Sequence, residues 1–172
     1  DIVRDGILLF EEPGVALAEP QPLSAEQALQ ETQEYFEEWF ESAKKAQKGP
    51  EFYRAEGDTK DAAFLMHQAV ERLYHCLLLT RTLYSPKTHN LSRLRQLSEE
   101  MEPSLKAVWP RETKSERRSF ELLREAYVKA RYSRQYRISA EELAWLSSRI
   151  EVLQRLVRQA CEDRIQQLAK AA

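Results

Sequence analysis

The sequence predicts an all-α fold, an antiparallel up-and-down bundle of four long helices with one or two short helices. Only four of the 172 residues are glycine, and runs of β-branched residues, which favour strands, are rare. Apolar residues instead recur at steps of three and four, the period of helices that are buried along one face. With 42% hydrophobic and 31% charged residues, the chain has the composition of a folded globular domain, and its length fits one domain.

The first 23 residues have no helical pattern. Residues 1–10 are mildly apolar, and three prolines follow between positions 13 and 22. Proline at this density interrupts helices and sheets because it lacks a backbone donor. We therefore expect residues 1–23 to be a tail and an extended linker left from an upstream domain, and residues 24–170 to form the helical domain.

The first long helix is predicted to begin at Ser24, because Ser24 and Gln27 have the spacing of a capping box. We expect the Gly49–Pro50 pair to close this helix. Its apolar stripe consists of Ala25, Leu29, Thr32, Phe36, Trp39, Ala43 and Ala46.

A second long helix is predicted from Asp58, a candidate N-cap, to about Tyr84. Its apolar residues point to more than one side, so we expect neighbouring elements to cover it on two sides. A short helix is expected at about 90–100, where leucines recur at three-residue spacing. The segment 103–110 lies between two prolines, and the pattern predicts at most a second short helix there.

The last two long helices complete the predicted bundle. One is expected over about 115–135, and the other begins at a capping box formed by Ser139 and Glu142. The final helix has a coiled-coil-like seam, as expected for a helix that packs lengthwise in a bundle. The seam consists of Leu143, Leu146, Ile150, Leu153, Val157 and Ala160.

Several classes of site have no motif in this sequence. The chain contains no GxxxxGK[ST] or GxGxxG phosphate loop, no CxxC pair and no GxSxG elbow, so we expect no cofactor. The net charge of −2 gives no whole-molecule attraction for nucleic acid. Cys76 and Cys161 lie at apolar helical positions, which predicts buried, reduced thiols and a cytoplasmic location. No apolar run is long enough to span a membrane.

The stretch KARYSRQYR, residues 129–137, combines four basic residues with two tyrosines. At 100° per residue, Arg131 and Arg134 fall on the same helix face as Tyr127. One interpretation is that the two guanidiniums snorkel at the negative end of the helix dipole. The other is a recessed cationic site, since the planar guanidinium fork suits phosphate.

Charge is unevenly distributed along the chain. Residues 111–137 carry nine basic and four acidic side chains, a net charge of +5, whereas residues 24–51 carry three basic and seven acidic side chains, a net charge of −4. A basic surface with interleaved tyrosines can hold RNA by phosphate contact and stacking. It can equally meet an acidic face of another subunit.

His67, Glu71 and His75 lie at steps of four along one helix face. Helical zinc sites use histidines four residues apart, whereas these are eight apart with no other clustered ligand, so we expect no metal. We expect Glu71 to pair with a neighbouring arginine and the histidines to pack at an interface.

Two passages resemble the HEPN superfamily of small helical-bundle domains in their order and spacing. They are AAFLMHQAVERLYHCLLLTRTLYSPKTHNLSRL at residues 62–94 and FELLREAYVKARYSRQYRIS at residues 120–139. The features that carry the resemblance are HQAVE, the KTHNL turn and the ARY run. It covers about residues 24–168.

The resemblance implies a prokaryotic helical bundle that often forms a homodimer, sometimes within a toxin–antitoxin pair. It also implies a nucleotidyltransferase domain as partner, either as a separate chain or fused in one polypeptide. Residues 1–10 look like the tail that follows the last strand of such a transferase. We therefore expect the chain to be the C-terminal half of a fusion.

Many HEPN domains are ribonucleases in which a histidine follows an arginine after four to six residues. In this sequence Arg131 occupies the matching place, and Tyr136 stands where the histidine would be. Histidine titrates near neutral pH, whereas tyrosine has an ordinary pKa of about 10 and is poorly suited to proton transfer there.

We therefore expect a non-catalytic module that binds nucleotide, RNA or a nucleotidyltransferase domain in a basic cleft. Arg131 is its predicted centre, oriented by Gln68 and Glu71 from the neighbouring helix, with Lys129, Tyr132 and Arg134 around it. One alternative is a divergent, toxin-like ribonuclease that uses Arg131 with Tyr136 or a nearby histidine as catalytic residues. Another is a purely structural dimerisation domain.

Overall fold

The structure, a computed structural model, describes residues 21–172. In this range it contains five α-helices, one short 3₁₀ helix and no strand, which confirms the all-α prediction. The elements are α2 (Ala25–Ala55), α3 (Thr59–Thr82), α4 (Leu91–Met101), η1 (Pro103–Ala107), α5 (Lys114–Tyr132) and α6 (Ala140–Ala169). The predicted tail and most of the predicted linker, residues 1–20, lie outside the described residues.

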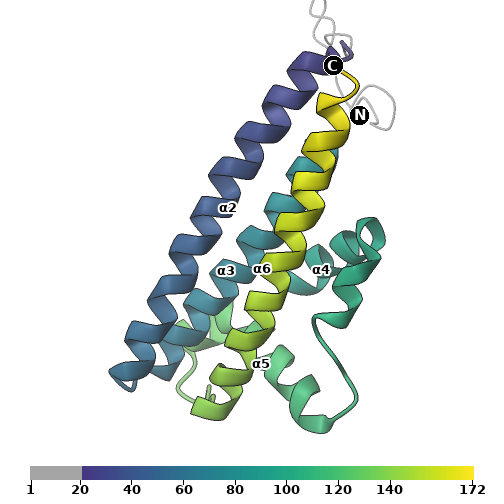
Figure 1. Cartoon of the computed structure of the whole chain (residues 1–172). Coiled ribbons are helices and arrows are strands. Elements are labelled where there is room, and N and C mark those ends of the chain that lie inside the picture. The colour runs from purple at the N-terminus through teal and green to yellow at the C-terminus, as the bar shows by residue number, and fades with distance from the viewer. Residues whose placement is uncertain (1–20) are drawn as a thin grey trace, which may run out of the picture.

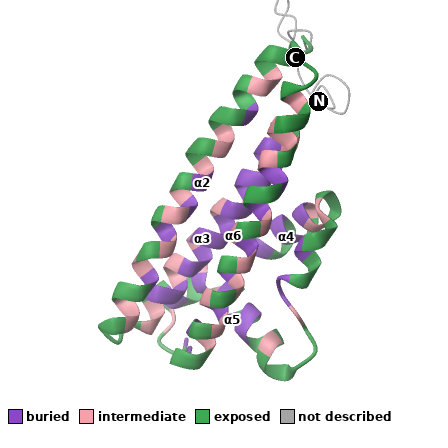
Figure 2. Cartoon of the chain, in the orientation of Figure 1, coloured by how far each residue is buried: buried purple, intermediate pink, exposed green. Residues whose placement is uncertain are grey.

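Helix α3 is the central element, because it packs against α2, α4, α5 and α6. Figure 1 shows α2, α3 and α6 side by side, with α2 running opposite to the other two and α5 at the end far from the C-terminus. Fifteen of the 24 residues of α3 are buried, whereas the outer face of α2 stays exposed (Figure 2). Four polar residues of α3 are therefore buried in the fold: His67, Glu71, His75 and Thr80.

The predicted helix starts are confirmed by their hydrogen bonds. At the start of α2, the Gln27 backbone N–H donates to Ser24 Oγ at 3.1 Å, and the Ser24 N–H donates to Gln27 Oε1 at 3.0 Å. Ser139 and Glu142 form the same reciprocal box at the start of α6. The Asp58 side chain accepts from the N–H of Asp61, as expected for a cap of α3.

The predicted end of α2 at Gly49–Pro50 is wrong, because the helix continues to Ala55. Pro50 is buried inside the helix, so packing outweighs the lost hydrogen bond. Gly49 lets α2 come close to α3, since a Cβ atom at this position would lie 2.5 Å from Leu65 Cδ1. The pair therefore marks a close helix contact and not a helix end.

Helix α5 is shorter than the sequence predicts, and this decides where its basic end lies. It begins at a third capping box, Thr113 with Glu116, and ends at Tyr132 instead of near residue 135. The Lys60 ammonium donates to the Ser133 carbonyl at 2.8 Å and so ties the end of α5 to the start of α3. The KARYSRQYR stretch is consequently half helix and half loop.

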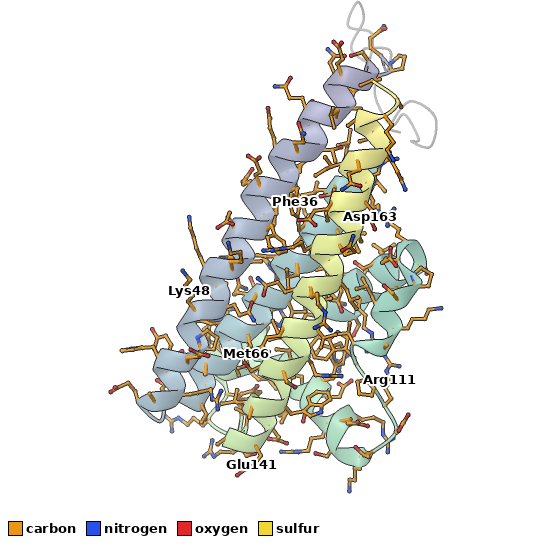
Figure 3. All side chains as sticks on the ribbon, in the orientation of Figure 1. Phe36, Lys48, Met66, Arg111, Glu141 and Asp163 are labelled. Carbon is orange, nitrogen blue, oxygen red and sulfur yellow. The ribbon has the colours of Figure 1, made fainter. Side chains whose placement is uncertain are left out.

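The core lies between the long helices and includes Trp109, which follows η1. Met66 lies between the helices, whereas Lys48 points away from them (Figure 3). Trp109 and Tyr74 are each 1% exposed, and Trp109 Nε1 donates to the Tyr74 hydroxyl at 2.8 Å. All seam residues of α6 are buried, as predicted.

The two cysteines, Cys76 on α3 and Cys161 on α6, are both buried and free. No helix in the described range is long and apolar enough to cross a membrane.

Replacing the Tyr74 hydroxyl tests this core contact. In Tyr74→Phe, the buried Trp109 N–H loses its acceptor, so we expect the free energy of unfolding to fall by about 1–3 kcal/mol. Urea unfolding followed by circular dichroism measures the change. The control is Tyr84→Phe, because Tyr84 is 69% exposed and should change stability little. Equal effects in both variants would show that the hydrogen bond contributes nothing.

Candidate functional site

Tyr127 on α5 is the centre of a cluster that joins α3, α5 and the turn before α4. The His89 ring stacks on it, with a centroid distance of 4.2 Å and an interplanar angle of 15°. The Arg131 guanidinium lies over the same ring at 4.5 Å, and the His67 ring lies 5.4 Å away. One aromatic ring thus connects the basic end of α5 to the histidines. We call Tyr127, Arg131, His89, His67 and Glu71 the Tyr127 cluster.

Arg131 is exposed and is held by aromatic rings and a backbone carbonyl. Its Nε donates to the Tyr127 carbonyl at 2.7 Å, and Nη2 donates to the same oxygen. Its guanidinium also lies 4.8 Å from the Phe64 centroid and 5.0 Å from that of Tyr132. Cation–π contacts orient a guanidinium without neutralising it. The remaining N–H groups are therefore free to meet an anion from solvent.

The expected role of Glu71 and Gln68 in orienting Arg131 is not what the structure shows. Glu71 is 7% exposed, and its carboxylate accepts hydrogen bonds from His89 Nδ1, at 3.1 Å to Oε1 and 3.0 Å to Oε2. Gln68 makes no side-chain hydrogen bond within residues 21–172. The sequence spacing correctly placed Glu71 on the same face of α3 as His67, but its carboxylate contacts His67 and His89 and forms no ion pair with Arg131.

His67 supports Glu71 from one helical turn away. It is fully buried, and its Nδ1 lies 3.0 Å from the Leu123 carbonyl, which can only accept, so Nδ1 carries a proton. Its Nε2 lies 3.4 Å from Glu71 Oε2 and can donate a hydrogen bond to it only when the ring is protonated on both nitrogens. Burial alone would raise the pKa of Glu71, but contacts with His67 and His89 outweigh it and hold that pKa below its ordinary value. Glu71 is therefore a buried carboxylate that remains ionised.

The third histidine lies beside the cluster. His75 Nδ1 is 2.6 Å from Ser85 Oγ, and its ring lies 5.2 Å from that of Trp39. Burial lowers the pKa of His75. A pocket of about 400 Å³ opens here, and His89 and Glu71 form part of its lining. Within residues 21–172, no three His, Cys, Asp or Glu side chains are grouped as metal ligands would be.

The other predicted site residues are divided between the surface and the core. Tyr132 is 74% exposed, and Arg134 is also exposed. Lys129 pairs with Glu125 at 2.7 Å, so part of its charge is compensated locally. Tyr136 is 4% exposed and donates to the Leu122 carbonyl at 2.9 Å, and burial raises its pKa. The structure therefore does not bring the Tyr136 hydroxyl to the exposed guanidinium of Arg131.

His89 is the residue that sequence reasoning did not select for the site. It belongs to the KTHNL turn and lies 18 residues after Glu71, its hydrogen-bond partner. Helix α3 ends at Thr82, so its periodicity does not extend to His89, and only the path of the turn back over α3 brings the two side chains together. The order of HQAVE and KTHNL in the sequence was the only available signal.

Comparison with protein families agrees with this architecture. The HEPN domain family matches residues 36–162, about three-quarters of the chain. This chain belongs to the HEPN domain family. The matched region contains α3, the KTHNL turn and α5, so the whole Tyr127 cluster lies within the HEPN domain. No curated protein matches the chain.

The Glu71 carboxylate should stabilise this HEPN domain in a pH-dependent way. Because folding lowers its pKa, its contribution is present above the ordinary value of 4.5 and is lost as the pH falls through the folded value. Glu71→Gln should therefore lower the free energy of unfolding at pH 7 by about 1–3 kcal/mol, the range for a buried charged hydrogen bond. The deficit should shrink below pH 4.5.

Urea unfolding at pH 7 and pH 3 measures this difference. Glu38→Gln is the matched control, because Glu38 is exposed on α2 and makes no ion pair with the described residues. A deficit in Glu71→Gln that is the same at both pH values would contradict the role of the carboxylate charge.

Proposed function

We propose that this HEPN domain binds single-stranded RNA at the Tyr127 cluster. HEPN domains are typically RNA-binding proteins or ribonucleases. The observation that carries the proposal is Arg131, whose guanidinium is exposed yet held among the rings of Phe64, Tyr127 and Tyr132. Such a guanidinium can bind phosphate, and the exposed Tyr132 ring beside it can stack on an unpaired base.

The charges near the end of α5 support a phosphate-binding surface. Upstream on the helix, Arg118 pairs with Glu142 and Arg124 pairs with Glu121. The last turn and the following loop instead contain cations that make no ion pair with carboxylates in residues 21–172. They are Arg131, Arg134 and Arg137, with Lys60 nearby on α3. The end of α5 and the loop after it thus contribute three arginines to the net charge of +5 over residues 111–137.

Two further partners belong to the proposal. A nucleotidyltransferase domain, in cis or in trans, is the partner implied by the resemblance of HQAVE, KTHNL and ARY to fused HEPN domains. A second copy of the chain is the other, and Val128 favours it, because this apolar side chain is 56% exposed one turn before Tyr132. In either assembly, the HEPN domain would hold nucleotide or RNA for its partner.

RNA affinity tests the proposal directly. We expect the purified chain to bind a fluorescent single-stranded RNA oligonucleotide, with an affinity that falls steeply as salt rises. Arg131→Ala and Tyr132→Ala should each weaken binding by about tenfold, because a stacked base contributes roughly 1–3 kcal/mol. Fluorescence anisotropy at two salt concentrations gives both quantities.

Matched controls separate this site from general charge effects. Arg155→Ala removes an exposed arginine from α6, and Tyr84→Ala removes an exposed tyrosine beyond the end of α3. Neither should change RNA affinity by more than twofold. If the controls weaken binding as much as the site variants do, RNA is not bound at the Tyr127 cluster.

A further inference from the structure

We infer that a second pocket, between α4 and residues 106–111, binds a ligand through a phosphate group. The pocket has a volume of about 310 Å³, and its lining shares no residue with the Tyr127 cluster. Arg95 on α4 contributes positive charge from one side, and Lys106 and Arg111 contribute it from the other. The inference goes beyond the proposed function and does not require that RNA bind at the Tyr127 cluster.

One face of α4 forms a wall of this pocket. Ser92, Arg95 and Glu99 recur at steps of three and four, so they project from the same side of the helix. On the neighbouring face, Leu91 and Leu94 are fully buried and anchor α4 in the core. Arg95 lies at the border between these two faces. Its side chain is therefore buried although it lines the pocket.

The state of Arg95 is the observation that carries the inference. Arg95 is 6% exposed, its guanidinium lies 4.9 Å from the Phe120 ring centroid, and its Nε donates to Glu99. Its Nη1 is buried and has no hydrogen-bond partner within residues 21–172. A buried charged donor without an acceptor is unfavourable. An oxyanion bound in the pocket would provide that acceptor.

The charges around the pocket leave an excess of positive charge. Three cationic and two acidic side chains line it, a net charge of +1. Glu99 already pairs with Arg95. Lys106 and Arg111, which follows η1 (Figure 3), are exposed and form no ion pair with a carboxylate in residues 21–172. The two side chains that face solvent with their charge uncompensated can therefore attract an anion to the pocket.

Phosphate suits this arrangement better than a carboxylate does. The oxygens of a phosphate point to the corners of a tetrahedron, so donors on several sides can reach it at once. A carboxylate has only two oxygens, which lie in one plane. Here the donors lie on two opposed walls, with guanidiniums from Arg95 and Arg111 and an ammonium from Lys106. Guanidiniums bind phosphate through paired N–H groups, and lysine binds it as a point charge.

The volume of the pocket limits the rest of the ligand. A volume of about 310 Å³ is at the lower end of the range for small-molecule sites, which leaves space for a phosphate and a group the size of a sugar. Two sources can present such a phosphate: a free phosphate ester and the phosphorylated end of an RNA chain. We expect the free ester, because the pocket is separate from the Tyr127 cluster.

An NMR titration tests where phosphate binds and how tightly. The ¹⁵N-labelled chain is titrated with inorganic phosphate, with chloride added to keep the ionic strength constant, and the backbone amide shifts are followed. We expect saturable shifts around the pocket, at Ser92, Lys106 and Arg111, and weaker binding of acetate in a parallel titration. Equal affinity for acetate would overturn phosphate as the ligand class. Shifts that do not saturate, or that occur only at the Tyr127 cluster, would overturn the site.

Variants of the lining test the role of each cation. Arg95→Met keeps an unbranched side chain against Phe120 and should weaken phosphate binding by at least about tenfold. Because Arg95 is buried and its replacement can disturb folding, Lys106→Gln and Arg111→Gln test the same site at exposed positions. Each should weaken binding by about threefold, as expected for an exposed ionic contact.

Lys114→Gln is the matched control, because it removes an exposed cation that does not line the pocket. It should leave the phosphate affinity unchanged. If Lys114→Gln weakens binding as much as Arg111→Gln does, the attraction is general and the site is overturned. A folded Arg95→Met protein that binds phosphate like the wild type would also overturn it.

Two further titrations identify the source of the phosphate. If the ligand is a free ester, ribose 5-phosphate but not ribose displaces inorganic phosphate, and a 5′-phosphate on an RNA oligonucleotide does not change its affinity. If the ligand is an RNA end, the 5′-phosphate strengthens RNA binding and Arg111→Gln removes the gain. Either result supports the phosphate site, and failure of both ligands to displace phosphate would overturn it. Failure of the chain to bind any RNA would overturn the proposed function alone.

Discussion

Burial of the Glu71 carboxylate is the constraint on which the arrangement of the site depends. The carboxylate of this buried residue on the central helix must find hydrogen-bond donors, because an unpaired charge inside a protein is strongly unfavourable. His67 faces it from the same helix, and His89 reaches it from the turn before α4. This need holds the turn against α3 and brings the His89 ring onto Tyr127.

In the same cluster, the C-terminal end of α5 holds the Arg131 guanidinium in place without neutralising its positive charge. Along α5, Arg118, Arg124 and Lys129 pair with glutamates one turn away or on α6. Arg131 instead uses aromatic rings and a carbonyl, which orient the guanidinium but leave its charge available. The distinction matters for function, because a basic side chain contributes fully to anion binding only when no carboxylate already neutralises its charge.

The corrections to the sequence-based picture share one physical origin. Gly49–Pro50 was expected to end α2, but close packing on Leu65 and burial of the proline keep the helix intact. Tyr136 was a candidate for catalysis because of its spacing from Arg131, yet the chain leaves the helix at Tyr132 and turns that side chain into the core. In both cases local pattern was outweighed by contacts between elements distant in sequence.

The sequence by itself determined the helices, because their apolar periodicity and capping boxes depend on residues three or four apart. It also determined that α3 carries His67, Glu71 and His75 on one face. Only the tertiary structure decided which groups meet there. Glu71 and His89 lie 18 residues apart, but α3 ends at Thr82 and Pro86 follows in the turn, so the helical period does not extend from one residue to the other. Their pairing depends on the folding of that turn over a buried charge, which is a property of the packed fold.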